Sequence, residues 1–217
     1  MKCDICGTKE AKYVCISCKR NVCASCYRPM LGLCTECAPM TPLKAESMDE
    51  LKSVVQRGIK KGDFTLSSGR KSSYYVDIKG VMTQPPTLQL LGKELSWRGV
   101  GYDGFAGVEL GAVPLVVASS LYSGKPCVII RKEKREHGTE KEYIGQIEEK
   151  SLCIIEDVTT TGASALRAAK VIRENGGHTD RVVTVVDREE GARERLESSG
   201  LELVALFRIS DFDGGQG

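Results

Sequence analysis

Short apolar segments alternate with amphipathic ones over most of the chain. The apolar segments, rich in β-branched and aromatic residues, predict strands at Ser73–Ile78, Gly104–Val108, Cys127–Arg131, Leu152–Ile155, Arg181–Val186 and Leu201–Ile209. Helical periodicity with Pro or Gly boundaries predicts helices between them, from after Pro86 to about Arg98 and at Ala112–Tyr122, Ala163–Glu174 and Gly191–Ser199. Fully apolar strands separated by helices indicate an α/β fold, with a central, mainly parallel sheet flanked by helices.

The segments on either side of this pattern predict the domain boundaries. Ser47-Met48-Asp49-Glu50 matches a capping box and predicts the start of a helix that continues to Gly62. Residues 38–47 hold two prolines and no apolar periodicity, which is typical of a linker. We therefore expect a cysteine-rich module at 1–37, the linker, a main domain at 48–210 and a disordered tail at 211–217.

The composition is that of an ordinary globular protein. The chain has 217 residues, of which 41% are hydrophobic and 28% charged. No apolar run approaches the roughly 18 residues that a membrane helix needs, and the N-terminal MKCDICGTKE lacks the apolar core of a signal peptide. We therefore expect no membrane contact and a cytoplasmic location.

Eight of the ten cysteines lie in the first 37 residues, as the CxxC pairs Cys3/Cys6, Cys15/Cys18, Cys23/Cys26 and Cys34/Cys37. A reducing cytoplasm favours metal over disulfides, and two such pairs complete a four-thiolate site with no open position for water. The pattern thus predicts two structural Zn²⁺ ions, whose binding would supply the folding energy of so small a module. The spacing resembles B-box and other cross-braced fingers, where the first pair joins the third, but sequential pairing is also possible.

Charge argues against nucleic acid as a partner. The formal net charge is +2, and eight thiolates with two zinc ions add −4, which changes the balance to −2. Nucleic-acid-binding fingers are usually more basic than this module. A contact with a protein partner, or a contact within a dimer, is the preferred interpretation of the module.

The stretch SLCIIEDVTTTGASAL (151–166) carries the most chemical information. It joins an apolar strand to a helix through threonines and a glycine, and α/β folds bind ligands at such strand ends. The threonines offer hydroxyls, the glycine lets the backbone approach a ligand closely, and the helix start offers free N–H groups. Together these groups suit a phosphate. No GK[ST] is present, and GVGYDG (99–104) has the spacing GxGxxG but follows a predicted helix instead of a strand. Both observations disfavour triphosphate and dinucleotide sites. Glu156 and Asp157 repel phosphate, so they fit a ligand that also carries hydroxyls or a metal, such as a ribose with bound Mg²⁺.

This stretch resembles the signature of the type I phosphoribosyltransferases, and three others resemble segments of the orotate phosphoribosyltransferase family. They are FTLSSGRKSSYYVDIK (64–79), GVELGAVPLVVA (107–118) and VVDREEGARERL (185–196), and the resemblance covers roughly residues 48–209. It implies the type I phosphoribosyltransferase fold. It also implies the Mg²⁺-dependent conversion of orotate and phosphoribosyl diphosphate to orotidine 5′-phosphate and diphosphate, in pyrimidine biosynthesis.

The resemblance also implies roles for individual residues. Backbone groups of 107–118 would meet the diphosphate. The implied orotate-binding residues are Tyr74, Tyr75, Thr160 and Arg188, and a guanidinium in a turn after an apolar strand suits bidentate carboxylate recognition on physical grounds as well. The implied donor-binding residues of the central stretch are Glu156, Asp157, Val158, Thr159, Thr160, Thr161, Gly162, Ala163 and Ser164.

The charged run RKEKREHG (131–138) resembles a loop that in this family reads RKExKxHG and closes over the diphosphate, often in the partner subunit's site. The implied diphosphate contacts are Arg131, Lys132, Arg135 and His137, and a homodimer is implied with them. The expected catalytic residues are Lys132, Arg135, His137, Glu156 and Asp157. Loop cations would stabilise the charge that grows on the departing diphosphate, and closure would exclude water. Arg135 replaces the family's lysine, and the two are not interchangeable at a precise site.

Two other functions stay open at this point. In the first, the main domain is a regulator that binds phosphoribosyl diphosphate while the zinc module contacts a partner or DNA; the added module and Arg135 favour this. In the second, the chain is a type I phosphoribosyltransferase for a purine or another base. Arg188 and the 131–138 motif argue against that alternative.

Overall fold

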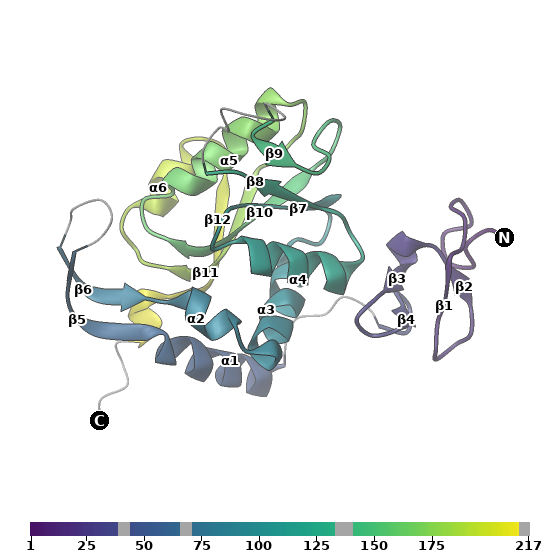
Figure 1. The fold of residues 1–217 in the computed structure, drawn as a ribbon, viewed down its shortest axis with the longest axis horizontal. Helices are drawn as coiled ribbons and strands as arrows, with labels where there is room; N and C mark the ends of the chain where they lie inside the picture. The colour runs from purple at the N-terminus through teal and green to yellow at the C-terminus, as the bar shows by residue number, and fades with distance from the viewer. Residues whose placement is uncertain (39–43, 66–70, 133–140, 213–217) are drawn as a thin grey trace.

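A six-stranded sheet with strand order β12-β11-β10-β7-β8-β9 lies at the centre of the molecule (Figure 1). The computed structural model describes residues 1–38, 44–65, 71–132 and 141–212. The strands are β7 (Gly104–Val108), β8 (Cys127–Ile130), β9 (Tyr143–Ile144), β10 (Leu152–Thr159), β11 (Arg181–Asp187) and β12 (Glu202–Arg208). All neighbours pair in parallel except β8 and β9, which are antiparallel. The predicted mainly parallel sheet is therefore confirmed.

Helices cover both faces of the sheet (Figure 1). One core cluster joins the sheet to α1 (Ala45–Arg57), α2 (Ile78–Met82), α3 (Pro85–Arg98) and α4 (Val113–Ser123), and the other joins it to α5 (Ala163–Glu174) and α6 (Ala192–Glu197). Successive strand residues belong to opposite clusters: Phe105 to the first and Ala106 to the second, then Cys153 and Ile154 in the same way. Because both faces are buried, the strands need apolar residues at every position, which is what made them recognisable in the sequence.

The start of the main domain differs from the prediction. Helix α1 (Ala45–Arg57) begins before the expected capping box: its N-cap is Lys44, which makes no side-chain cap hydrogen bond, and Ser47 lies inside the helix. Ala45 and Glu46 are strong helix formers, and they extend the helix toward the N-terminus. The helix also ends earlier than Gly62, at Gly58, where any Cβ would lie 2.8 Å from the Asp77 carbonyl oxygen.

The residues that follow form a hairpin. Strand β5 (Ile59–Thr65) pairs antiparallel with β6 (Lys71–Val76), and the short helix α2 (Ile78–Met82) follows. Neither β5 nor α2 was predicted. The strand depends on its pairing with β6, in which Ile59 lies opposite Val76 and Thr65 opposite Lys71, so the local sequence alone carries little sign of it.

The chain end is more ordered than expected at two residues. Asp211 and Phe212 belong to the 3₁₀ turn η2 (Ile209–Phe212), and Phe212 is buried with its ring 5.7 Å from that of Phe207. Residues 213–217 of the expected tail and 39–43 of the expected linker lie outside the described residues. In the described ranges, no helix has the length and apolar character required to cross a membrane.

The cysteine-rich head, residues 1–38, contains two small hairpins. Strand β1 (Tyr13–Val14) pairs with β2 (Asn21–Val22), and β3 (Tyr27–Arg28) pairs with β4 (Leu33–Cys34), with the 3₁₀ turn η1 (Ala24–Cys26) between them. Its core consists mainly of cysteines with Val22. The head also contacts the main domain, because the buried Arg28 side chain donates a hydrogen bond to the Ser123 carbonyl at the end of α4.

Candidate active site

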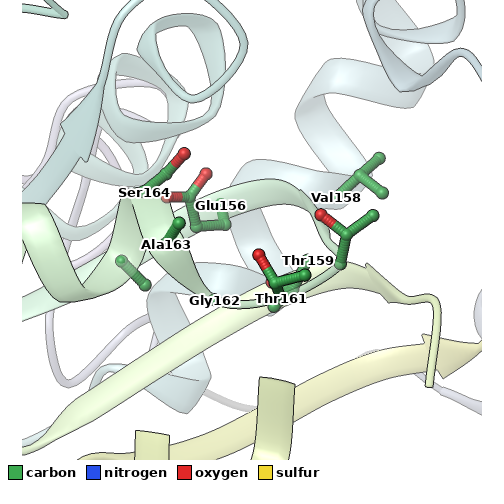
Figure 2. Close-up of a pocket in the computed structure, with 9 residues that line it drawn as sticks. Glu156, Val158, Thr159, Thr161, Gly162, Ala163 and Ser164 are labelled. Carbon is green, nitrogen blue, oxygen red and sulfur yellow. The ribbon is translucent and has the colours of Figure 1, made fainter. Parts of the chain in front are cut away.

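The loop between β10 and α5 has the form expected of a phosphate cradle. Gly162 is the N-cap of α5 and has φ +74°, a left-handed conformation that glycine adopts without strain. Figure 2 shows the Thr159, Thr161 and Ser164 hydroxyls and the Glu156 carboxylate around this loop. The Thr159 hydroxyl is buried and has no hydrogen-bond partner in the described part of the chain. The loop thus offers hydroxyls and the free N–H groups of a helix start to one small anion.

Glu156 is an unusual carboxylate. Its side chain is buried at 6% exposure, and Oε1 has no hydrogen-bond partner among the described residues. Burial, reinforced by the charge of Asp157, raises the pKa of Glu156 to about 8. A buried carboxylate without partners is costly, so this one is suited to a cation or to the hydroxyls of a ligand.

Asp157 is held from two sides. Its Oδ2 lies 3.3 Å from the Lys79 ammonium nitrogen on α2. The carboxylate also occupies the space where a side chain at position 111 would begin, since a Cβ built on Gly111 would lie 2.2 Å from Asp157 Oδ2. Gly111 is therefore needed for the loop after β7 to approach β10 this closely. The same loop is tied to the end of β8, because the Lys132 backbone N–H donates to Glu109 Oε1 at 2.9 Å.

Arg188 directly follows β11, the strand that pairs with β10. Its side chain is 7% exposed, its guanidinium lies 2.9 Å from Glu190 Oε1, and it donates to the Tyr74 carbonyl at 3.4 Å. Its backbone N–H donates to the Thr159 carbonyl at 2.9 Å, which fixes the turn against the cradle. The guanidinium is therefore oriented beside the predicted phosphate loop.

These groups line one cleft of about 820 Å³. The predicted site residues that line it are Tyr75, Lys132, Glu156, Asp157, Val158, Thr160, Thr161, Ala163, Ser164 and Arg188. Thr159 and Gly162 line the adjoining pocket of the cradle. Two predicted residues are placed differently: Tyr74 contributes its carbonyl to Arg188, and the Arg131 backbone N–H donates to the Glu142 carbonyl at 2.8 Å. Arg135 and His137 lie outside the described residues.

Some lining residues were not singled out from the sequence. They are Val76, Lys79, Val108, Glu109, Leu110 and Gly111. The stretches 64–79 and 107–118 pointed to these segments, but only the fold shows that Lys79 reaches Asp157 and that Gly111 gives Asp157 its space.

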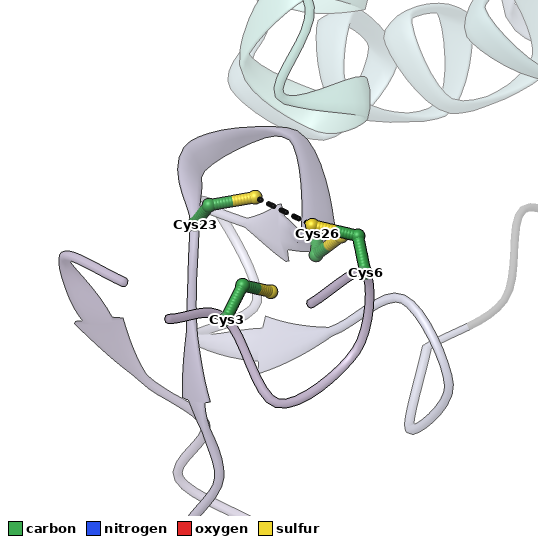
Figure 3. Close-up of side chains that lie close together, drawn as sticks. All are labelled: Cys3, Cys6, Cys23 and Cys26. Atoms are coloured by element: carbon green, nitrogen blue, oxygen red, sulfur yellow. Dashed lines mark hydrogen bonds between the residues drawn. The ribbon is translucent and has the colours of Figure 1, made fainter. Parts of the chain in front are cut away.

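The eight N-terminal cysteines gather into two groups of four. One contains Cys3, Cys6, Cys23 and Cys26 (Figure 3), and the other contains Cys15, Cys18, Cys34 and Cys37. In each group the sulfur atoms all lie within 4.8 Å of one another. The first pair thus joins the third and the second joins the fourth, which is the cross-braced alternative. Four thiol ligands at this separation suit one tetrahedral ion per group.

Comparison with known proteins decides the family. No family model matches the chain. The orotate phosphoribosyltransferase of Pyrococcus abyssi is 47% identical over 167 residues, which cover 74% of this chain and 92% of that protein. That of Methanosarcina acetivorans is 48% identical over 156 residues, covering 70% and 83%. The chain belongs to the orotate phosphoribosyltransferase family. The predicted activity, a glycosyltransferase of pyrimidine biosynthesis, is thereby confirmed.

Solved structures agree with this family. The crystal structure of Mycobacterium tuberculosis orotate phosphoribosyltransferase in complex with phosphoribosyl diphosphate is 31% identical, has a TM-score of 0.64, and matches 76% of this chain and 98% of that one. The predicted type I phosphoribosyltransferase fold is confirmed. The similarity to orotate phosphoribosyltransferases, both in sequence and in structure, sets aside the alternative of a purine phosphoribosyltransferase.

Proposed function

We propose that this orotate phosphoribosyltransferase binds phosphoribosyl diphosphate along the cleft, with the 5′-phosphate in the cradle and the diphosphate beside the loop after β7. Thr160, Thr161 and Ser164 offer hydroxyls to the phosphate, and the helix start offers its N–H groups. The backbone of Glu109–Gly111 and the Lys132 side chain line the part of the cleft assigned to the diphosphate. The single observation that carries the proposal is one cleft containing both the cradle and Arg188.

The acids would hold the ribose and its metal. Glu156 Oε1 has no partner among the described residues, and Asp157 Oδ2 lies 3.3 Å from the half-exposed Lys79 ammonium, so the pair fits Mg²⁺ and ribose hydroxyls. Mg²⁺ bound with the diphosphate would neutralise charge on the leaving group. Glu156 and Asp157 orient the ribose, and their negative charge favours the positive charge that develops at the anomeric carbon.

Arg188 would hold the orotate carboxylate, with Thr160 and Tyr75 along the same cleft. A guanidinium carries several N–H donors in one planar fork, and this geometry matches the two oxygens of a carboxylate. The 131–138 loop would close over the diphosphate, with Lys132, Arg135 and His137 adding positive charge. We further propose a homodimer in which this loop enters the partner subunit's cleft.

A direct assay tests the function. The purified chain with Mg²⁺, orotate and phosphoribosyl diphosphate is expected to consume orotate, measured by its absorbance, and to lose this activity without Mg²⁺. Binding of phosphoribosyl diphosphate without any turnover would contradict the proposal. It would favour instead the regulator alternative, in which the zinc head contacts a partner or DNA.

The two cysteine groups are proposed to hold structural Zn²⁺. Metal analysis of the intact chain is expected to give two zinc ions per chain, and Cys15→Ser is expected to reduce this to about one, since each group of four fits one ion. Cys127→Ser is the matched control, because Cys127 belongs to neither group, and it should retain both ions. A zinc content near zero in the wild-type chain would refute the assignment.

A further inference from the structure

An uncharged groove lies between the head and the main domain. Its volume is about 370 Å³, and Met30 of the head faces residues from α3 and α4 across it. The lining residues from α3 and α4 are Pro85, Leu88, Gln89, Val113, Pro114, Val117, Ala118 and Leu121. The described chain therefore contributes no charged side chain to this lining, which is typical of the centre of a protein interface rather than of a solvated surface.

The apolar surface continues from the groove to the active-site cleft. Val113, Val117 and Leu121 are spaced four residues apart along α4, so they form one stripe on that helix. Leu110, in the loop that precedes α4, is 75% exposed and also lines the cleft. One apolar surface thus extends from the mouth of the cleft, along α4, to Met30 of the head. We call this surface the α4 face, and define it by Leu110, Val113, Val117, Leu121 and Met30.

The head is firmly placed at the end of the α4 face. Arg28 is 7% exposed and donates to the Ser123 carbonyl, where the negative end of the α4 dipole favours a cation. The next residue, Gly124, has φ +73°, and a Cβ there would lie 2.5 Å from the Tyr27 carbonyl oxygen and 2.9 Å from that of Ala24. The head and α4 are thus packed closely, and Met30 is held in line with the helix stripe.

We propose that a second copy of this chain covers the α4 face, and that the head is therefore part of the homodimer interface. The inference rests on the dimer of the proposed function: a partner whose 131–138 loop enters the cleft must lie beside the elements that border it, and Leu110 joins cleft and α4 face. A two-fold interface places the same patch on both sides, which an uncharged stripe allows without repulsion between like charges.

The exposed area also fits this occupant. Leu110, Val117, Leu121 and Met30 are 75, 37, 48 and 40% exposed, which amounts to on the order of 400 Å². A standard interface buries roughly 800 Å² per partner, of which about 500 Å² is apolar. The α4 face therefore supplies most of the apolar surface that a stable dimer needs. Met30 adds to this surface from each copy, which gives the head a role in assembly.

The test is Met30→Glu in the full-length, zinc-loaded chain. A carboxylate within this apolar contact should weaken dimerisation at least about tenfold, measured by sedimentation over a range of concentrations. Val14→Glu places the same charge on the same head, at a residue that is 52% exposed and does not line the groove, and it should dimerise like the wild type. Zinc content and thermal unfolding, expected to be unchanged, show that both variants remain folded.

Leu121→Glu separates this inference from the proposed function. If Leu121→Glu dissociates the dimer and Met30→Glu leaves it as tight as the wild type, the head lies outside the interface; the inference is then wrong and the proposed dimer stands. If the wild-type chain is a monomer at every concentration, with and without phosphoribosyl diphosphate, both the dimer and this inference are overturned. The orotate assay would still report on the proposed chemistry.

Discussion

Replacing Arg188 by alanine is expected to lower kcat/KM for orotate by roughly 10²- to 10³-fold, because a paired, charge-assisted contact with a carboxylate contributes about 3–4 kcal/mol. The Arg188 side chain is only 7% exposed and lines the same cleft as Thr160, so bulk water cannot replace it freely. The loss should appear mainly in the KM for orotate, whereas the KM for phosphoribosyl diphosphate should change little.

Steady-state kinetics with orotate and with uracil, which lacks the carboxylate, make this test specific. The wild type should prefer orotate strongly, and Arg188→Ala should bring the two rates close together, an effect that a general loss of structure would not cause. Arg208→Ala is the matched control, because Arg208 ends the neighbouring strand opposite Asp187 and lines a separate cavity. If Arg188→Ala kept the preference for orotate, the carboxylate would have to be bound elsewhere.

The sequence predicted the sheet best where both faces are buried. Gly104–Val108 and Ala163–Glu174 have the predicted bounds, because continuous apolar residues mark the strand and an amphipathic stripe marks the helix. The hairpin β5–β6 was predicted only in part. Lys60 and Lys61 are paired with Tyr75 and Tyr74 of a strand further along the chain, a relation that no local pattern reveals.

The same distinction applies to the candidate site. The cradle residues are contiguous, so a single stretch of sequence contained them. Lys79 and Gly111 come from other elements, and their relation to Asp157 depends on how α2 and the loop after β7 meet β10. The contact between the head and the main domain could not be predicted from the sequence either. No sequence pattern distinguishes Arg28 from an exposed arginine, because its burial depends on the Ser123 carbonyl at the end of α4.

Glu156→Gln is expected to have opposite effects on activity and on stability. Activity should fall roughly 10²-fold, since the variant lacks the charge that the ribose and the metal-bound donor are proposed to meet. Stability should rise at alkaline pH. The folded chain keeps the Glu156 proton up to a pKa of about 8, whereas the unfolded chain releases it near the ordinary value of 4.5. Between these values the folded state binds more protons, so wild-type stability falls as the pH rises.

The glutamine variant cannot ionise at this position, so its stability should lack that decline. Above pH 8 its free energy of unfolding should exceed that of the wild type by a few kcal/mol, and the difference should shrink as the pH falls toward 5. Thermal unfolding at several pH values measures this, with Glu202→Gln as the control, because Glu202 lies exposed at the start of β12. An equal shift at every pH would contradict the burial argument.

The same ionisation should make wild-type binding of the Mg²⁺-bound donor tighten toward pH 8, and the variant should lack that dependence. Together the two trends would mean that Glu156 lowers the stability of the unliganded chain in order to present a charge that only the ligand satisfies.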